Sequence, residues 1–323
     1  METVLGNADL LGSAEDSAIV KMAGTRYMIQ NTDIFTPIVD DPYIQGKIAA
    51  CNITNDVFAC GVLDIRSMLC FLAAPSTIPG WVLTDMLMGM KDFLTELGCE
   101  IAGGHTIINP WILLGGTATG FTDERYLIRN TGMKPGDVLI LTKALGTQPA
   151  MALHRVMKRP EFLENVRDVV PRSELQGIVD GAIKAMVTTN KPAVEVIREL
   201  IDESKGQFTV HAMTDVTGFG LAGHSENLAR ASRVDVEITR IPHFKWAMEL
   251  SEMMGYDLAN ARSAETAGGL LIALDPRHQE TLERALKARG IPHYLVGRAI
   301  SSGTGKVHVS SQVIYQPITN AGL

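Results

Sequence analysis

The stretch from Thr32 to Gly61, TDIFTPIVDDPYIQGKIAACNITNDVFACG, passes from a strand pattern to a helix pattern. Its first residues complete the segment TRYMIQNTDIF, in which β-branched and apolar residues predict a strand. Pro42 follows Asp41, a position that helix starts tolerate, and the residues after it predict a helix over 43–60. A strand that leads into a long helix indicates mixed α/β structure.

Strand-like and helix-like segments alternate along the rest of the chain. The sequence predicts further strands at SAIVKM and at 66–74, 100–104, 111–121, 137–142, 208–214, 269–274 and 294–298. It predicts further helices at 81–97, 146–158, 172–189, 191–204, after Gly220 and at 277–289. Proline and glycine cluster in NTGMKPGD (130–137), so we expect an N-terminal domain over 1–133 and a C-terminal domain over 134–323. The expected fold class is α/β, with two α+β halves of similar size.

Composition narrows the classes of partner. The chain has 323 residues, 46% of them hydrophobic, as in ordinary globular proteins. The net charge is −7, and no basic stripe is present, which argues against nucleic acid as a partner. An acidic protein can still bind an anion such as ATP when metal ions and backbone amides intervene.

The cysteines and the apolar runs of the sequence indicate a reducing, cytoplasmic compartment. The four cysteines form no C-x-x-C pair, so we expect neither a disulfide framework nor a zinc site. No apolar run reaches the roughly 18 residues that a membrane-spanning helix needs. The N-terminus has no basic segment followed by an apolar one, as a secretory signal would. We therefore expect a cytoplasmic protein that does not enter a membrane.

Four aspartates are candidate ligands, because each lies at a strand end, on a helix face or at a glycine-rich corner. They are Asp16, Asp33, Asp56 and Asp215. An isolated aspartate at a strand end is more often a turn or cap residue, and Asp215 before TGFG could be an N-cap.

Asn52 and Asp56 are harder to explain as turn or cap residues, because i,i+4 spacing places both on one face of an otherwise apolar helix. A half-buried carboxylate costs several kcal/mol without a partner. Mg²⁺ is the natural partner, since it prefers a few carboxylates together with polyphosphate oxygens.

Two further segments permit alternative interpretations. In AGGHTIINP (102–110), Gly103 and Gly104 let the backbone approach a ligand closely, while His105 alone is more often a structural histidine. In LTKALGTQ (141–148), Lys143 either contacts phosphate or is solvated. Neither a Walker A motif nor G-x-G-x-x-G occurs.

Four segments of the chain resemble the selenophosphate synthetase (selenide, water dikinase) family and occur in the order that this family has. They are TDIFTPIVDDPYIQGKIAACNITNDVFACG, AGGHTIINPWILLGGTATG, KPGDVLILTKALGTQ and MTDVTGFGLAGH. That family belongs to the aminoimidazole ribonucleotide synthetase superfamily. The resemblance spans about 12–225, with a fainter match at SAETAGGLLIAL. The forms NPWILLGG and LTKALGTQ look most like the eukaryotic branch.

The resemblance implies a fold, an assembly and a reaction. An N-terminal sheet would form a barrel across a homodimer, a C-terminal α/β domain would pack beside it, and ATP would bind at the subunit interface. The implied enzyme is a phosphotransferase that converts selenide, ATP and water to selenophosphate, AMP and phosphate for selenocysteine synthesis. A protein that donates selenide is a possible further partner.

The resemblance also implies site residues. Asp16, Asp56 and Asp215 would bind Mg²⁺. ATP would contact a set drawn from both subunits: Ser13, Ala14, Glu15, Asp33, Asn52, Asp56, Gly103, Gly104, His105 and Thr106.

One departure from the family pattern concerns catalysis. The family has a cysteine or selenocysteine and a nearby lysine before the position of Asp16, but METVLGNADLLGSAE contains neither. We expect an N-terminal truncation and a chain with little or no activity, and a natural form without this loop is the alternative. The tail ARSAETAGG also lacks the Asp-Pro that usually precedes its Thr-Ser/Ala-Gly-Gly.

Two other functions stay open. One is another ATP-dependent enzyme of the superfamily, acting on a formylglycinamidine, thiamine phosphate or carbamoyl substrate. The other is a non-catalytic dimeric scaffold or regulator, which the absent Cys and Lys favour and the four aspartates disfavour.

Overall fold

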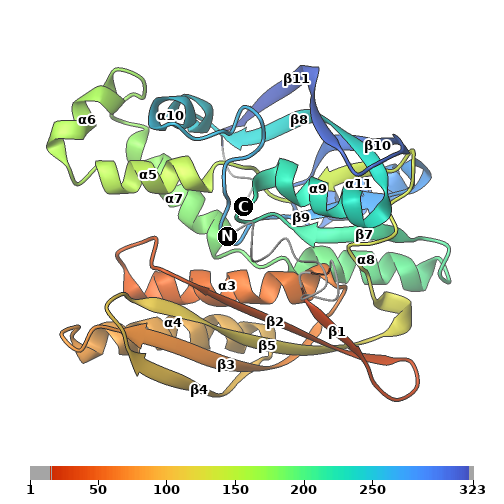
Figure 1. Cartoon of the computed structure of the whole chain (residues 1–323), viewed down its shortest axis with the longest axis horizontal. Helices are drawn as coiled ribbons and strands as arrows, with labels where there is room; N and C mark the ends of the chain where they lie inside the picture. The colour runs from red at the N-terminus through yellow and green to blue at the C-terminus, as the bar shows by residue number, and fades with distance from the viewer. Residues whose placement is uncertain (1–14, 16, 320–323) are drawn as a thin grey trace.

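The computed structural model describes residue 15 and residues 17–319 of the chain. Its elements form an N-terminal and a C-terminal unit, each built on an open mixed sheet (Figure 1). The N-terminal elements are β1 (Ala18–Lys21), β2 (Arg26–Phe35), α3 (Pro42–Ala59), β3 (Asp64–Ala74), α4 (Gly80–Leu97), β4 (Glu100–Ile108), β5 (Leu113–Asp123) and the 3₁₀ helix η1 (Glu124–Tyr126).

Helix α3 begins where the sequence predicts. The side chain of Asp41 accepts hydrogen bonds from the backbone N–H groups of Tyr43 and Ile44, and Pro42 occupies the first turn. The helix contacts β2 and β5 on one side and β7, α7 and α8 of the C-terminal unit on the other. It is therefore buried nearly all round, as expected for a helix without a continuous polar face.

Helices α3 and α4 pack with their backbones in contact at two glycines. A Cβ atom on Gly46 would lie 2.0 Å from the carbonyl oxygen of Met86, and one on Gly89 would lie 1.9 Å from that of Tyr43. Real Cβ atoms do not approach a carbonyl oxygen so closely, so this crossing requires glycine at both positions.

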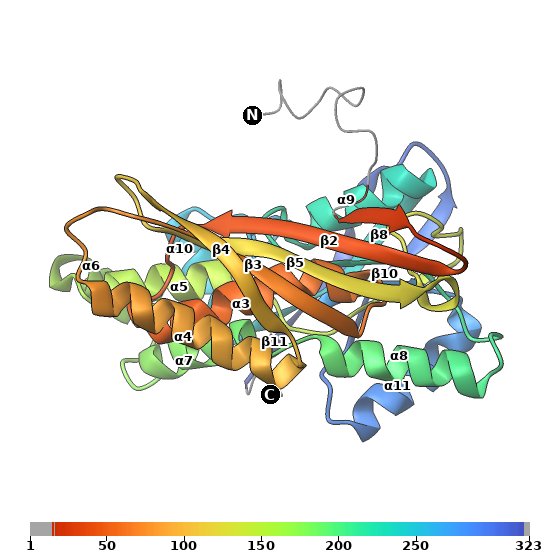
Figure 2. The same ribbon diagram turned by 90° about the horizontal axis from the view of Figure 1, so that it is seen from below.

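Sheet A has the strand order β1-β2-β5-β3-β4. Among the described elements, helices α3 and α4 pack against one of its faces and none covers the other (Figure 2). Seen from below, β2, β5 and β3 face the viewer without a helix in front of them (Figure 2). On this open face Thr32 and Thr117 share a hydrogen bond of 2.8 Å, and Ile34, Leu69 and Ile107 are exposed. Within one chain sheet A stays open, so the predicted barrel would require a second chain.

The C-terminal unit contains sheet B, with the strand order β11-β8-β10-β6-β9-β7. Its strands are β6 (Val138–Leu141), β7 (Val210–Asp215), β8 (Val234–Phe244), β9 (Leu270–Leu274), β10 (Tyr294–Ser302) and β11 (Val307–Ile318). Its helices are α5 (Thr147–Val156), α6 (Pro160–Arg167), α7 (Leu175–Met186), α8 (Lys191–Glu203), α9 (Gly220–Ser232), α10 (Ala247–Met254) and α11 (Pro276–Ala288). The sequence did not predict α6, β8, α10 or β11.

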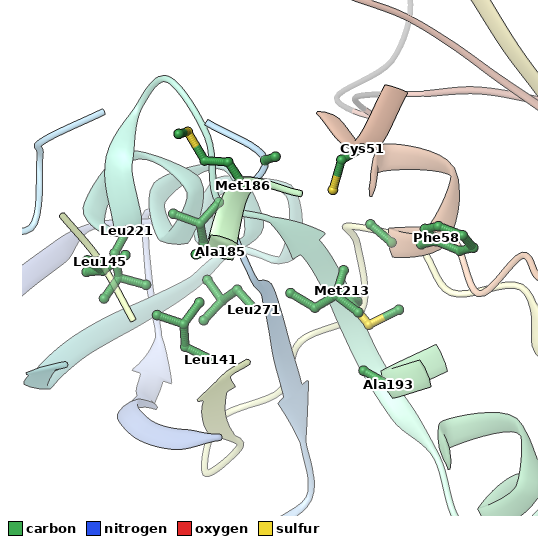
Figure 3. Packing of buried hydrophobic residues seen from close by; sticks show 14 of the residues in the cluster. Cys51, Phe58, Leu141, Leu145, Ala185, Met186, Ala193, Met213, Leu221 and Leu271 are labelled. Atoms are coloured by element: carbon green, nitrogen blue, oxygen red, sulfur yellow. The ribbon is translucent and has the colours of Figure 1, made fainter. Parts of the chain in front are cut away.

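One hydrophobic cluster runs through both units. Figure 3 shows part of it, with Cys51 and Phe58 of α3 in the same cluster as Met186 of α7 and Met213 of β7. Because α3 supplies side chains to both halves of this core, polar groups on α3 lie at the junction of the two units.

Candidate active site

Strand β2 and helix α3 bring four polar side chains together. Asn31 Nδ2 donates to Asp56 Oδ2 (2.7 Å) and to Asp33 Oδ2 (3.1 Å). Asn52 Nδ2 donates to the same oxygen of Asp33 at 3.0 Å. We call Asn31, Asp33, Asn52 and Asp56 the carboxylate cluster.

The cluster places its amides inside and its carboxylates at the edge of solvent. Asn31 and Asn52 are buried, whereas Asp33 and Asp56 are half-buried. Both amide contacts with Asp33 reach the same oxygen, Oδ2. Oriented carboxylates of this kind suit a divalent cation shared with a polyphosphate. Sequence reasoning missed Asn31, although strand alternation puts it on the same face as Asp33.

The loop from Glu265 to Gly269 lies against this cluster. The backbone N–H of Ala267 donates to Asn52 Oδ1 at 2.8 Å, and Asn55 Nδ2 donates to the carbonyl of Gly268 at 3.3 Å. A Cβ atom on Gly268 would lie 1.9 Å from the carbonyl oxygen of Val216, so only glycine fits there. This backbone segment of the C-terminal unit thus contacts two amide side chains of α3, one of which, Asn52, belongs to the carboxylate cluster.

Glu265 opens this loop and is a buried carboxylate that the sequence reading overlooked. It accepts hydrogen bonds from the backbone N–H groups of Gly146 (2.7 Å) and Thr147 (2.9 Å), and from Thr147 Oγ1 (2.6 Å). Burial raises the pKa of Glu265 to about 7, while the three donors act in the opposite direction. Glu265 therefore anchors the loop to the start of α5.

Asp215 ends β7 and is 1% exposed. It precedes Val216, whose N–H donates to the carbonyl of Gly269 at 2.9 Å. The N-cap interpretation of Asp215 is wrong, because α9 begins at Gly220 and its N-cap residue is Phe219. The charge of Asp215 acts on two buried groups, Lys143 and Cys51.

The glycine corner after Asp215 brings the chain close to the segment before Glu265. Gly220 has φ 67°, and a Cβ atom there would lie 2.7 Å from the carbonyl oxygen of Ser263. His224 Nε2 accepts a hydrogen bond from the N–H of Thr217 at 3.0 Å, which requires a neutral ring. Burial lowers the pKa of His224 to about 4, consistent with that neutral form. This histidine holds the corner in place.

Lys143 satisfies neither of its two sequence interpretations. It is 6% exposed, so it is not solvated. Its Nζ donates to the backbone carbonyls of Thr188 (2.6 Å), Ala267 (2.7 Å) and Ala185 (3.1 Å), which engages all three ammonium protons away from a phosphate. Burial lowers the pKa of Lys143, and the nearby Cys51 and Asp215 act to raise it.

The remaining predicted residues that the structure describes do not join the carboxylate cluster within one chain. Gly103, Gly104, His105 and Thr106 lie on β4, the edge strand, with β3 and β5 between them and β2. Glu15 accepts a hydrogen bond from the N–H of Asn130 at 3.1 Å, next to the connection between the units. Ser13, Ala14 and Asp16 lie outside the described residues.

The described residues include oxygen atoms that could bind a metal ion, but they do not form a complete set of ligands. Among residue 15 and residues 17–319, no three His, Cys, Asp or Glu side chains lie where they could hold one ion. The predicted set Asp16, Asp56 and Asp215 has one member outside that range and stays a prediction. Two carboxylates oriented by amide N–H donors fit Mg²⁺ that takes its other ligands from phosphate and water.

Two domain families match the chain and define its class. The N-terminal domain of AIR synthase related proteins matches residues 14–122, and the C-terminal domain of the same proteins matches residues 134–310. Among solved structures, thiamine monophosphate kinase from Aquifex aeolicus superposes with a TM-score of 0.72 at 17% identity, covering 98% of each chain. The HypE–HypF complex superposes with a TM-score of 0.74 at 18% identity, covering 96% of this chain and 95% of that chain. The predicted boundary between residues 133 and 134 stays a prediction.

Proteins of similar sequence show which family within this class the chain belongs to. Selenide, water dikinase from Methanococcus maripaludis is 43% identical over 94% of this chain and 89% of its own length. Its counterpart from Methanocaldococcus jannaschii is 43% identical over 94% of this chain and 85% of its own length. The chain therefore belongs to the selenide, water dikinase family.

The expected eukaryotic type is not supported. Selenide, water dikinase from Trypanosoma brucei brucei is 36% identical over 85% of this chain and 71% of its own length, below both archaeal relatives. The short stretches NPWILLGG and LTKALGTQ were too little sequence to assign a branch. Within the described residues, no helix is both long and apolar enough to cross a membrane.

Proposed function

We propose that this chain uses ATP to convert selenide and water to selenophosphate, with AMP and phosphate as the other products. The observation that carries the proposal is the 43% identity over 94% of the chain to a selenide, water dikinase. The carboxylate cluster supports it, because an acidic protein of net charge −7 needs cations to hold a polyphosphate.

We assign the following duties to the chain's own residues. Asp56 and Asp215, with Asp16, hold Mg²⁺, while Asp33 and Asp56 orient the nucleotide. Asn31 and Asn52 fix the carboxylates by donating to them, so little reorganisation is needed when the nucleotide binds. Mg²⁺ held by these carboxylates would supply electrostatic stabilisation of the negative charge that develops during phosphoryl transfer.

The open face of sheet A supports an assembly of two chains. We propose that two copies pair through this face into a closed barrel, and that Gly103, Gly104, His105 and Thr106 of one chain complete the ATP site of the other. Ile34, Leu69 and Ile107 are apolar side chains that a second sheet would bury. Sedimentation equilibrium is expected to give twice the chain mass of 35.0 kDa, and a monomer at all concentrations would contradict the pairing.

The four cysteines, Cys51, Cys60, Cys70 and Cys99, are buried. We propose that the chain binds Mg-ATP through the carboxylate cluster and that these four thiols do not act as nucleophiles in the reaction.

An assay of AMP formation tests the reaction. We expect AMP to accumulate only when Mg²⁺, ATP and selenide are all present. Omitting selenide is the control for background ATP hydrolysis.

Other outcomes separate the alternatives. AMP or ADP formation that depends on thiamine phosphate, a formylglycinamidine or a carbamoyl compound would assign the chain to another enzyme of the superfamily. A dimer that binds no Mg-ATP in calorimetry would support the scaffold.

A further inference from the structure

Hydrogen bonds connect Lys143 of the C-terminal unit to Asp33 of the N-terminal unit through two intermediate residues, Ala267 and Asn52. The path begins at Lys143, which follows β6 and is buried. Its Nζ donates to the backbone carbonyl of Ala267 at 2.7 Å. Its other protons go to the carbonyls of Thr188 and Ala185, so its position is set by three acceptors from two separate segments.

The second link is Ala267, which is held through both of its backbone polar groups. Its carbonyl accepts from Lys143, and its N–H donates to Asn52 Oδ1 at 2.8 Å. Ala267 also has φ 48°, in the left-handed region that residues with a Cβ rarely adopt. A strained conformation of this kind persists only where the surrounding contacts hold it.

The third link is Asn52, whose amide can act in one orientation only. Its Oδ1 accepts from Ala267, so its Nδ2 points the other way and donates to Asp33 Oδ2 at 3.0 Å. An amide turned over would place Nδ2 against the N–H of Ala267 and Oδ1 against the carboxylate, which opposes both contacts. The backbone of Ala267 thereby decides which atom Asn52 presents to Asp33.

We propose that Lys143 is a positioning residue for nucleotide binding, acting on Asp33 through Ala267 and Asn52. The inference rests on the proposed function, since it assigns Asp33 to the nucleotide site. Lys143 itself touches neither nucleotide nor metal in this assignment. It couples the C-terminal unit to the orientation of an N-terminal carboxylate.

The variant Lys143→Met tests the inference, because methionine has a similar length and no donors. We expect the Kd for Mg-ATP, measured by calorimetry well below the melting temperature, to rise about tenfold, equivalent to ~1.4 kcal/mol. Asn190→Leu is the matched control: Asn190 Nδ2 donates to the carbonyl of Gly268 at 2.8 Å, in the same loop but off the path to Asp33. Asn190→Leu is expected to change the Kd by less than about twofold, although it also removes a buried hydrogen bond.

A double-mutant cycle separates positioning from general destabilisation. If Lys143 acts through Asn52, then Asn52→Leu raises the Kd, and adding Lys143→Met to it produces little further change. Full additivity of the two effects, an unchanged Kd in Lys143→Met, or an equal loss in Asn190→Leu would each overturn the inference. Should Lys143→Met fail to fold, Lys143→Gln, which keeps two N–H donors, is expected to change the Kd in the same direction by less.

The inference and the proposed function can fail separately. Absence of Mg-ATP binding by the unsubstituted chain would overturn the proposed function. The same cycle is then measured in urea unfolding, where linked residues give costs that fall short of additivity and independent residues give costs that add. Additive costs there would overturn the link between Lys143 and Asn52 itself.

Discussion

Asp56→Asn is expected to weaken Mg-dependent ATP binding by about a hundredfold, equivalent to ~2.7 kcal/mol. The substitution removes a negative charge and a metal-binding oxygen with almost no change in volume. It should leave the melting temperature within a few degrees of the unsubstituted value, because Asp56 is half-buried and Asn31 retains contacts with Asp33 and the carbonyl of Ile53. Isothermal titration calorimetry with and without Mg²⁺ measures the effect.

Asp64→Asn is the control for Asp56→Asn. Asp64 begins β3 in the same unit and pairs with Arg66 at the surface, so removing its charge alters the net charge equally without touching the carboxylate cluster. We expect its ATP affinity to match that of the unsubstituted chain. Unchanged affinity in Asp56→Asn, or a lowered melting temperature with affinity intact, would show that Asp56 is structural.

Gly89→Ala is expected to destabilise the chain by about 2–3 kcal/mol. Its new Cβ would lie 1.9 Å from the carbonyl oxygen of Tyr43, a backbone atom of the neighbouring helix α3. Neither side chain rotation nor local repacking can relieve that overlap, so α3 and α4 must move apart. The urea concentration at half-unfolding, followed by circular dichroism, gives the loss.

Gly80→Ala is the matched control on the same helix. Gly80 is the first residue of α4, and a Cβ atom there would meet nothing within 4 Å. Its stability is expected to change by less than about 0.5 kcal/mol. Because alanine has the higher helix propensity, propensity alone would stabilise both variants, so a similar loss in both would contradict the crossing of α3 and α4 as its cause.

Local patterns predicted most elements because the relevant signals lie close together in the chain. The helix expected over 43–60 is found at Pro42–Ala59, where Asp41 and Pro42 mark its start within a few residues. Strand β8 was missed because Pro242 interrupts it, and proline usually argues against a central strand. Here Pro242 pairs with Gln316 of β11, a partner far along the chain that no local pattern announces.

In the candidate site, too, local patterns identified residues that lie close together in the chain and missed contacts between distant ones. Asn52 and Asp56 were found from i,i+4 spacing, and strand alternation could have added Asn31 next to Asp33. The contact of Asn52 with Ala267 joins residues 215 positions apart, so only tertiary structure reveals it. For the same reason Lys143 was misread: its burial depends on carbonyls from the end of α7 and from the loop at Ala267, not on its neighbours in LTKALGTQ.

All four cysteines are buried, and burial raises the pKa of Cys51, Cys70 and Cys99 to about 11. In the folded chain all four thiols are therefore hidden, and those of Cys51, Cys70 and Cys99 are also protonated, two conditions under which thiols react slowly with maleimides. A cysteine introduced at the surface would be labelled selectively without first removing the native ones. Fluorescent probes on the two units could then follow their relative movement during turnover, and modification of the native thiols would report unfolding.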